Sequence, residues 1–135
     1  MKNTSLFLRI AYCWGIIADA VSAILMLFPG LFLRVMDFDL EPGRNFAFGL
    51  YYGVPLMIGW TILLIWAGRK PLERKGILLL TLPVILGYMV IETYAISTRL
   101  TSLGSGLPLL AMQTGLFTII VFSCRQARDM AREIK

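Results

Sequence analysis

Four long apolar stretches constrain this chain more than any other feature of its sequence. They cover about 6–28, 46–67, 76–98 and 107–124. A helix needs about 20 apolar residues, within a range of about 17–25, to cross a hydrocarbon layer about 30 Å thick. Each stretch is therefore predicted to be a transmembrane helix. Because the four stretches and their short links use nearly the whole chain, residues 1–135 are predicted to form a single integral membrane domain.

The composition agrees with this interpretation. The 135 residues are 58% hydrophobic and only 16% charged, whereas a soluble domain has roughly 45–50% apolar and about 25% charged residues. One small core cannot bury this much apolar surface, so part of it must face lipid. The first stretch also has features of a signal peptide, because Lys2 and Arg9 precede an apolar run and Ala18-Asp19-Ala20 mimics a small-residue cleavage site. Apolar residues continue to Phe28, however, which predicts a retained helix.

The basic residues predict the orientation. Ten of the thirteen fall on one side of the predicted spans. These are Lys2, Arg9, Arg69, Lys70, Arg74, Lys75, Arg125, Arg128, Arg132 and Lys135. Because Lys and Arg near span ends mark the cytoplasmic face, both termini are predicted to be cytoplasmic in a cell membrane. The net charge of +5 is then a topology signal, and a nucleic-acid partner is not expected.

The short links predict an all-α membrane protein with a four-transmembrane-helix up-and-down bundle. The tight basic link at 68–75 should make the second and third spans antiparallel neighbours, and the residues after Arg125 should continue as a polar helix. The longest link, 29–45, has apolar residues at helical spacing after Pro29, which suits a helix start. We expect a short interfacial helix there, ending at 41–43.

The sequence offers little for catalysis. It has no histidine, and its two cysteines, Cys13 and Cys124, are far apart and form no CxxC pair. The commonest metal ligand and the thiol pair of a redox enzyme are therefore missing. We find no nucleophile–base pair and no cofactor motif. The chain is predicted not to be an enzyme and to hold no metal or cofactor.

Two carboxylates lie inside the predicted spans. Asp19 is about 13 residues into an outward-running helix, roughly 20 Å from the inner edge at ~1.5 Å per residue. Glu92 is about 16 residues into another outward-running helix, roughly 24 Å from that edge. Gln113 is near the outer start of the fourth span, and Tyr51 and Tyr52 enter the second span from the outer side. Four helices thus place polar groups in the outer half of the bilayer.

A carboxylate at the centre of a bilayer costs about 2.5–3.5 kcal/mol on insertion scales, so such groups normally face the bundle interior and find a partner. No basic residue lies in the middle of any span. We therefore expect at least one of Asp19 and Glu92 to be protonated at neutral pH and able to donate a hydrogen bond. The candidate ligand-binding residues are Asp19, Glu92, Gln113, Tyr51, Tyr52, Tyr88 and Ser22.

Several functions are compatible with such a pocket. The leading hypothesis is binding of a small amphipathic or cationic molecule, or a membrane lipid, without catalysis. In a structural alternative, the two acids only link helices through hydrogen bonds worth about 1 kcal/mol each. A third hypothesis is a proton- or cation-coupled transporter acting as a homodimer. A fourth is a scaffold or accessory subunit that uses the small-residue faces at Gly49/Gly53 and Ala111/Gly115.

The segment 59–75, GWTILLIWAGRKPLERK, resembles runs in small uncharacterised prokaryotic four-helix membrane proteins, a resemblance that implies a fold and no activity. Asp19 in the first span is similar in kind to the single membrane carboxylate of small multidrug-resistance exporters, which use a glutamate in a different local pattern. Asp19 and Glu92 together are similar in kind to the acidic pocket of emopamil-binding and sigma-receptor-type proteins. The histidine of the isomerases in that group is missing here, and no residue roles are carried over.

Overall fold

Five helices follow one another in this computed structural model, which describes residues 2–38, 41 and 43–133, with side chains at 6–38, 41 and 43–126. They are α1 (Lys2–Leu27), α2 (Pro29–Met36), α3 (Arg44–Gly68), α4 (Lys75–Ser97) and α5 (Leu103–Glu133). Lys135 and the side chains of Lys2, Arg128 and Arg132, which contributed to the predicted orientation, lie outside this described part.

The all-helical prediction is confirmed, because every regular element among the described residues is a helix. Four helices are long and apolar enough to cross a membrane, with candidate spans at Leu6–Leu27, Arg44–Gly68, Lys75–Ser97 and Leu103–Gln126. These bounds agree with the predicted stretches to within about four residues, the usual uncertainty of helix ends read from sequence. α5 also continues as a helix past Arg125, as predicted.

The expected short helix in the first long link is present as α2. Proline occupies the first turn, and the helix ends at Met36, where Asp37 adopts a left-handed backbone conformation with φ 52°. The predicted end at 41–43 is therefore wrong, and Pro42 lies outside the described residues. α2 is anchored by Leu33, which is buried, and by Phe32, whose ring lies 6.3 Å from the ring of Phe46 on α3.

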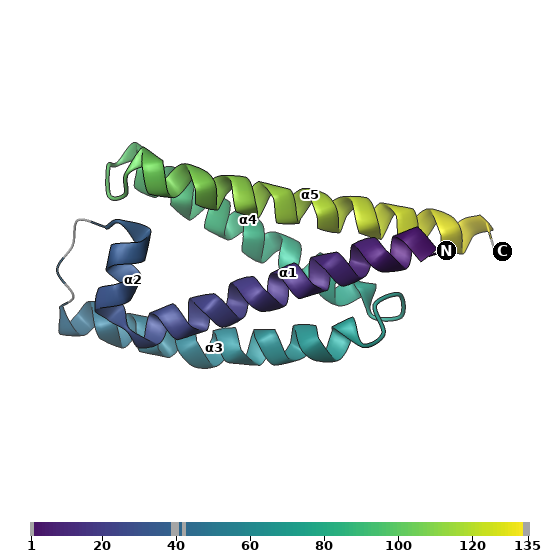
Figure 1. Cartoon of the computed structure of the whole chain (residues 1–135), viewed down its shortest axis with the longest axis horizontal. Coiled ribbons are helices and arrows are strands. Elements are labelled where there is room, and N and C mark those ends of the chain that lie inside the picture. Colours follow the sequence, from purple (N-terminus) through teal and green to yellow (C-terminus); the bar gives the residue numbers. More distant parts are fainter. Residues whose placement is uncertain (1, 39–40, 42, 134–135) are drawn as a thin grey trace.

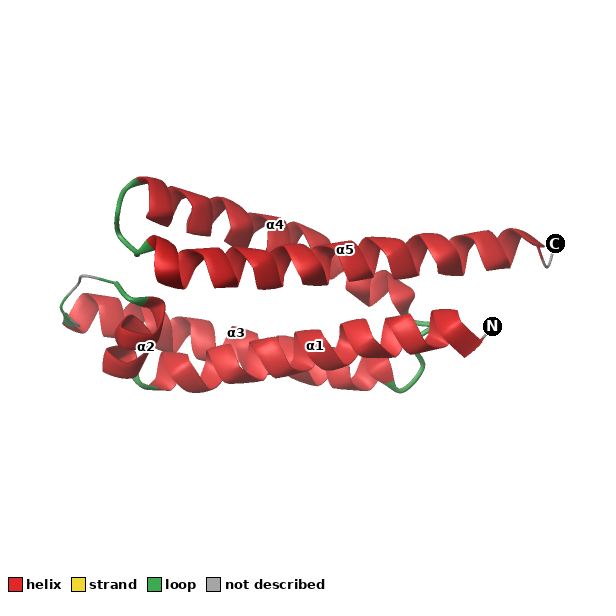
Figure 2. Cartoon of the chain, turned by 45° about the horizontal axis from the view of Figure 1, so that its top comes forward, coloured by secondary structure: helices red, strands yellow, loops and turns green. Residues whose placement is uncertain are grey.

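The long helices form two layers (Figures 1 and 2). α1 packs mainly on α3, α4 packs mainly on α5, and α1 joins the layers through its contact with α5. The prediction that the second and third spans are close neighbours is wrong in this respect: α3 and α4 are joined by a short turn but contact each other little. A tight turn fixes only the ends of two helices, and the packing faces decide their partners.

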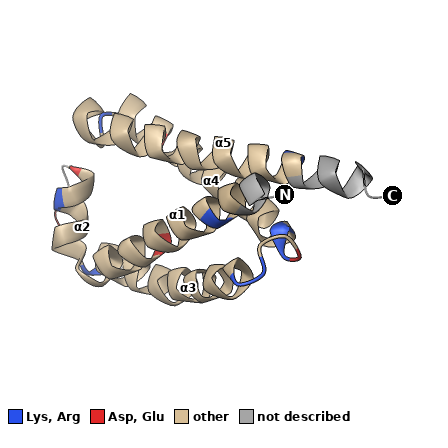
Figure 3. Cartoon of the chain, turned by 45° about the vertical axis from the view of Figure 1, so that its right-hand side comes forward, with Lys and Arg blue, Asp and Glu red and all other residues tan. Residues whose placement is uncertain are grey.

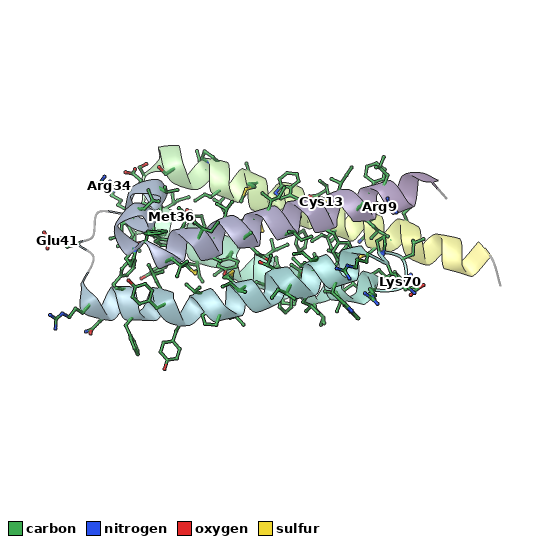
Figure 4. All side chains as sticks on the ribbon, turned by 60° about the horizontal axis from the view of Figure 1, so that its bottom comes forward. Arg9, Cys13, Arg34, Met36, Glu41 and Lys70 are labelled. Carbon is green, nitrogen blue, oxygen red and sulfur yellow. The ribbon has the colours of Figure 1, made fainter. Side chains whose placement is uncertain are left out.

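The two ends of the molecule differ. α1 begins and α5 ends at the end that also holds the α3–α4 turn (Figure 1), and we call this the basic end. α2 and the α4–α5 turn, residues 98–102, lie at the other, which we call the α2 end. Figure 4 shows Lys70 at the basic end and Arg34 and Glu41 at the α2 end. Between the two ends the helices are mostly uncharged, although an acidic residue interrupts α1 (Figure 3).

All four long helices meet in the half of the molecule toward the basic end. The main core cluster takes Leu8 and Tyr12 from α1, Leu64 from α3, Ile85 from α4 and Leu116 from α5. Toward the α2 end, the α1–α3 and α4–α5 pairs diverge (Figure 3). Trp60 on α3 and Met89 on α4 lie one turn further toward the α2 end and still pack against this core cluster.

The basic end is closed by polar contacts around the α3–α4 turn. The hydroxyl of Tyr12, whose side chain is 1% exposed, donates a hydrogen bond of 2.8 Å to the backbone carbonyl of Arg74. The Arg74 guanidinium lies 3.4 Å above the centre of the Trp66 ring, a cation–π arrangement. These contacts hold the turn against α1 and fix where α4 begins.

Candidate functional site

Contacts between α1 and α3 place Asp19 level with Trp60. The two helices run antiparallel, so each step along one corresponds to a step back along the other. A Cβ atom at Gly15 would lie 3.2 Å from Leu64, and one at Gly53 would lie 3.1 Å from the sulfur of Met26. Asp19 is four residues after Gly15 on α1, and Trp60 is four residues before Leu64 on α3. The contact between Gly53 and Met26 follows the same register. Asp19 and Trp60 thus occupy one level of this helix pair.

Contacts of α5 place Gln113 within one turn of the same level. The Phe7 and Phe122 rings meet edge to face at 5.6 Å, and the Trp14 ring lies 3.5 Å from the Cβ position of Gly115. Asp19 is five residues after Trp14 on α1, so the residue level with it on the antiparallel α5 is five residues before Gly115, at position 110. Gln113 is three residues, or ~4.5 Å, closer to the basic end.

Tyr88 brings the fourth helix to this level. Its phenol interacts electrostatically with Asp19, although the residue is 40% exposed and therefore lies at the margin of the layer. On its own helix, each of these four residues lies one turn from a closely packed residue. The closely packed residues are Gly15 on α1, Leu64 on α3, Ile85 on α4 and Leu116 on α5. We call Asp19, Trp60, Tyr88 and Gln113 the polar layer. It borders the core cluster, against which Trp60 packs.

Three members of the polar layer carry buried polar atoms without a hydrogen bond in the described part of the chain. These atoms are Oδ2 of Asp19, Nε1 of Trp60 and Oε1 of Gln113. A fourth such atom, Oε1 of Gln126, lies at the other end of α5. Leaving a buried donor or acceptor unsatisfied costs about 1–3 kcal/mol, and more for a charged group. Three such atoms at one level call for a common explanation.

Glu92 and Ser22 lie about one turn beyond the polar layer, toward the α2 end. Glu92 is half-buried, and its Oε1 is 3.1 Å from the position that a Cβ atom at Gly106 would take. Glu92 therefore packs in the interface between α4 and α5. The Ser22 hydroxyl donates 2.8 Å to the carbonyl of Ala18 in its own helix, which satisfies its donor locally.

Tyr51 and Tyr52 are placed apart from the polar layer. Their side chains are 48% and 73% exposed, and the Tyr52 ring stacks edge-on with Phe48 of the same helix at 5.0 Å. On α3 they lie eight or nine residues from Trp60, about 12 Å toward the α2 end. The structure thus groups Asp19, Gln113 and Tyr88 and does not bring the two tyrosines of α3 to them.

Trp60 is the member of the polar layer that the sequence analysis did not single out. Tryptophan is common as a packing or interface residue in membrane helices, so its presence alone carries no site information. What identifies Trp60 is the register of α3 against α1. Only the pairing of Gly15 with Leu64 and of Gly53 with Met26 shows that Trp60 is the residue of α3 opposite Asp19.

The hydrogen-bonding character of the polar layer is specific. Asp19, when ionised, and Gln113 offer acceptor oxygens, while Trp60 offers a donor N–H and Tyr88 a hydroxyl that can do either. A partner for all of them must supply at least two donors and one acceptor. Water can do this, and so can an ammonium group beside a hydroxyl.

No protein-family profile, curated protein or solved structure matches this chain.

Proposed function

We propose that this chain is a four-span protein of the cell membrane that binds a small amphipathic cation between its helices, without catalysis. The single observation that carries the binding proposal is the polar layer, in which three unsatisfied buried polar atoms come from three helices and lie within about one helical turn of a common level. A carboxylate in the middle of a membrane span that faces other helices is a functional candidate by default.

The membrane placement is supported by the four apolar helices and by the distribution of basic residues. The start of α1, the end of α5 and the α3–α4 turn belong to the basic end, which we place in the cytoplasm. Labelling of Cys substitutions in intact cells tests this orientation. A membrane-impermeant maleimide should label Gly43→Cys at the α2 end and not Gly76→Cys at the basic end, in a background lacking Cys13 and Cys124. The reverse labelling would refute the orientation.

The chemistry of the layer defines the ligand class. An ammonium group provides the charge and donors that Asp19 and Gln113 lack, and an adjacent hydroxyl provides an acceptor for the Trp60 N–H. The remaining walls are apolar helices, so the rest of the ligand should be an alkyl chain. The expected ligand is therefore a primary amine with a neighbouring hydroxyl and an apolar tail.

Binding can be tested with a dodecyl amino alcohol as the probe, titrated into protein in lipid nanodiscs. Thermal stabilisation should saturate with wild-type protein.

Asp19→Asn should weaken the apparent affinity at least about tenfold, equivalent to ~1.4 kcal/mol. The matched control Glu41→Gln removes an acid outside the helices and should bind as wild type does. Dodecyltrimethylammonium has the same charge but no N–H donors, so it should bind more weakly. Equal binding by Asp19→Asn and wild type would remove the basis of the proposal.

A further inference from the structure

A cavity lies at the α2 end, apart from the polar layer. It lies between the end of α2 and the α4–α5 turn and has a volume of about 670 Å³, within the range of about 300–1,000 Å³ typical of small-molecule sites. Its lining includes Asp37, Arg99, Ser97 and Ser102, together with apolar residues such as Leu103. We call it the Asp37–Arg99 cavity.

The two walls of this cavity are tied together. The Thr101 hydroxyl donates a hydrogen bond of 2.7 Å to the carbonyl of Met36, and Phe38 pairs with Thr101 in an antiparallel backbone bridge. Thr101 itself is only 5% exposed. The end of α2 is therefore fixed on the α4–α5 turn, and residues on either side of the bond keep their separation.

Two opposite charges are held at this cavity without neutralising each other. Asp37 comes from the end of α2 and Arg99 from the α4–α5 turn, and no ion pair joins them in the described part of the chain. Both adopt left-handed backbone conformations, with φ 52° and 59°, which are uncommon for residues other than glycine, Asn and Asp. A ligand with one anionic and one cationic group satisfies both charges.

The position of the cavity indicates where such a ligand comes from. α4 ends at Ser97 and α5 begins at Leu103, so the cavity is level with the ends of two candidate spans. If those helices cross the bilayer as proposed above, this is the level of the lipid head groups. The first turn of α5 adds a partial positive charge beside Arg99, and the Ser102 hydroxyl caps the Ser105 N–H within that turn. Leu100 and Leu103 are exposed and extend the cavity lining toward the hydrocarbon region of the bilayer.

We propose that the Asp37–Arg99 cavity binds the head group of a phospholipid that carries both a phosphate and a primary ammonium, drawn from the outer leaflet. Arg99 and the start of α5 take the phosphate, and Asp37 takes the ammonium. Ser97 and Ser102 also line the cavity, but the Ser97 hydroxyl donates to the Tyr94 carbonyl and the Ser102 hydroxyl oxygen accepts from the Ser105 N–H. The lipid source rests on the membrane orientation proposed above, and the site does not depend on the polar layer.

Native mass spectrometry of protein released from micelles tests this proposal with three probes. They are phosphatidylethanolamine, phosphatidylglycerol, which lacks the ammonium, and glycerophosphoethanolamine, which lacks the acyl chains. Wild-type protein should retain one phosphatidylethanolamine in preference to the other two probes. Arg99→Asn should reduce this retention at least about fivefold, or ~1 kcal/mol. Asn adopts the left-handed conformation more readily than most residues, so the backbone should persist.

Asp37→Asn gives a result that misfolding cannot imitate. It should lose phosphatidylethanolamine while retaining as much or more phosphatidylglycerol, because only the acidic partner has gone. The control Arg44→Asn removes a basic residue at the same end that does not line the cavity, and it should behave as wild type. Dodecyl amino alcohol binding should be unchanged in all three variants, which separates this site from the polar layer. Retention of phosphatidylethanolamine by the Arg99 and Asp37 variants, or equal binding of glycerophosphoethanolamine by wild type, would overturn the proposal.

Discussion

Asp19 on α1 and Trp60 on α3 lie at one level of an antiparallel helix pair, each with a buried polar atom that makes no hydrogen bond in the described part of the chain. One atom is an acceptor and the other a donor. Their shared level depends on the register of α1 against α3, which can be tested directly.

Cysteine cross-linking tests the register of α1 against α3. The Met26 sulfur lies over Gly53, so Met26→Cys with Gly53→Cys should form a disulfide under mild oxidation in a background lacking Cys13 and Cys124. The offset pair Met26→Cys with Leu56→Cys should not, because Leu56 is 67% exposed. Gel mobility with and without reductant measures both. Preferential cross-linking of the offset pair would show that Asp19 and Trp60 are not level.

Two glycine substitutions should shift stability in opposite directions. A Cβ atom at Gly106 would lie 2.6 Å from both Cγ1 and Cδ1 of Ile96, so Gly106→Ala should lower the free energy of unfolding by about 1–3 kcal/mol through overpacking. Gly87 on α4 has open space around its Cβ position. Gly87→Ala should therefore raise stability by roughly 0.5–1 kcal/mol through helix propensity. Denaturant unfolding in micelles compares the two, and equal effects would contradict the described α4–α5 packing.

Tyr12 should contribute through its hydroxyl as well as its ring. Tyr12→Phe removes the donor to the Arg74 carbonyl and should lower the free energy of unfolding by about 0.5–1.5 kcal/mol. Tyr94→Phe is the matched control, because Tyr94 is 62% exposed and should change stability little. The same unfolding assay measures both variants. An unaffected Tyr12→Phe protein would show that the α3–α4 turn is not held by this bond.

Thr101 should hold α2 on the α4–α5 turn. Thr101→Val keeps the shape of the side chain but removes the hydrogen bond to Met36, and we expect a loss of about 0.5–1.5 kcal/mol in the free energy of unfolding. Thr93→Val is the comparison, since the Thr93 hydroxyl bonds only the Met89 carbonyl of its own helix. If both variants lose the same stability, the bond between Thr101 and Met36 is not a tether.

Much of the fold can be predicted from the sequence because the signal is long and repeated. About 20 apolar residues in a row indicate a spanning helix whatever its neighbours, and α2 follows from Pro29 and the helical spacing after it. The pairing of helices cannot be predicted in this way. Apolar residues surround each span, so no single face marks the partner, and the short link at 69–74 wrongly favours α3 against α4.

The candidate site shows the same limit at the level of single residues. Depth in the bilayer follows from counting, and on that basis Asp19, Gln113 and Tyr88 can be selected. The direction in which a side chain points requires the rotation of its helix, which counting does not supply. Tyr51 and Tyr52 are therefore selected by depth although they are exposed, and Trp60 is missed. Asp37 and Arg99 are separated by 62 positions in the sequence, so only the folded chain brings them to one cavity.

The indole N–H signal of Trp60 measures the central claim most directly. In protein labelled with ¹⁵N-tryptophan, the three indole signals can be assigned by replacing Trp14, Trp60 and Trp66 with Phe one at a time. Addition of the dodecyl amino alcohol should shift the Trp60 signal, leave the Trp66 signal in place, and shift nothing in Asp19→Asn at the same concentration. A Trp60 signal that stays fixed while the probe binds, or that moves equally in Asp19→Asn, would contradict a shared ligand between Asp19 and Trp60.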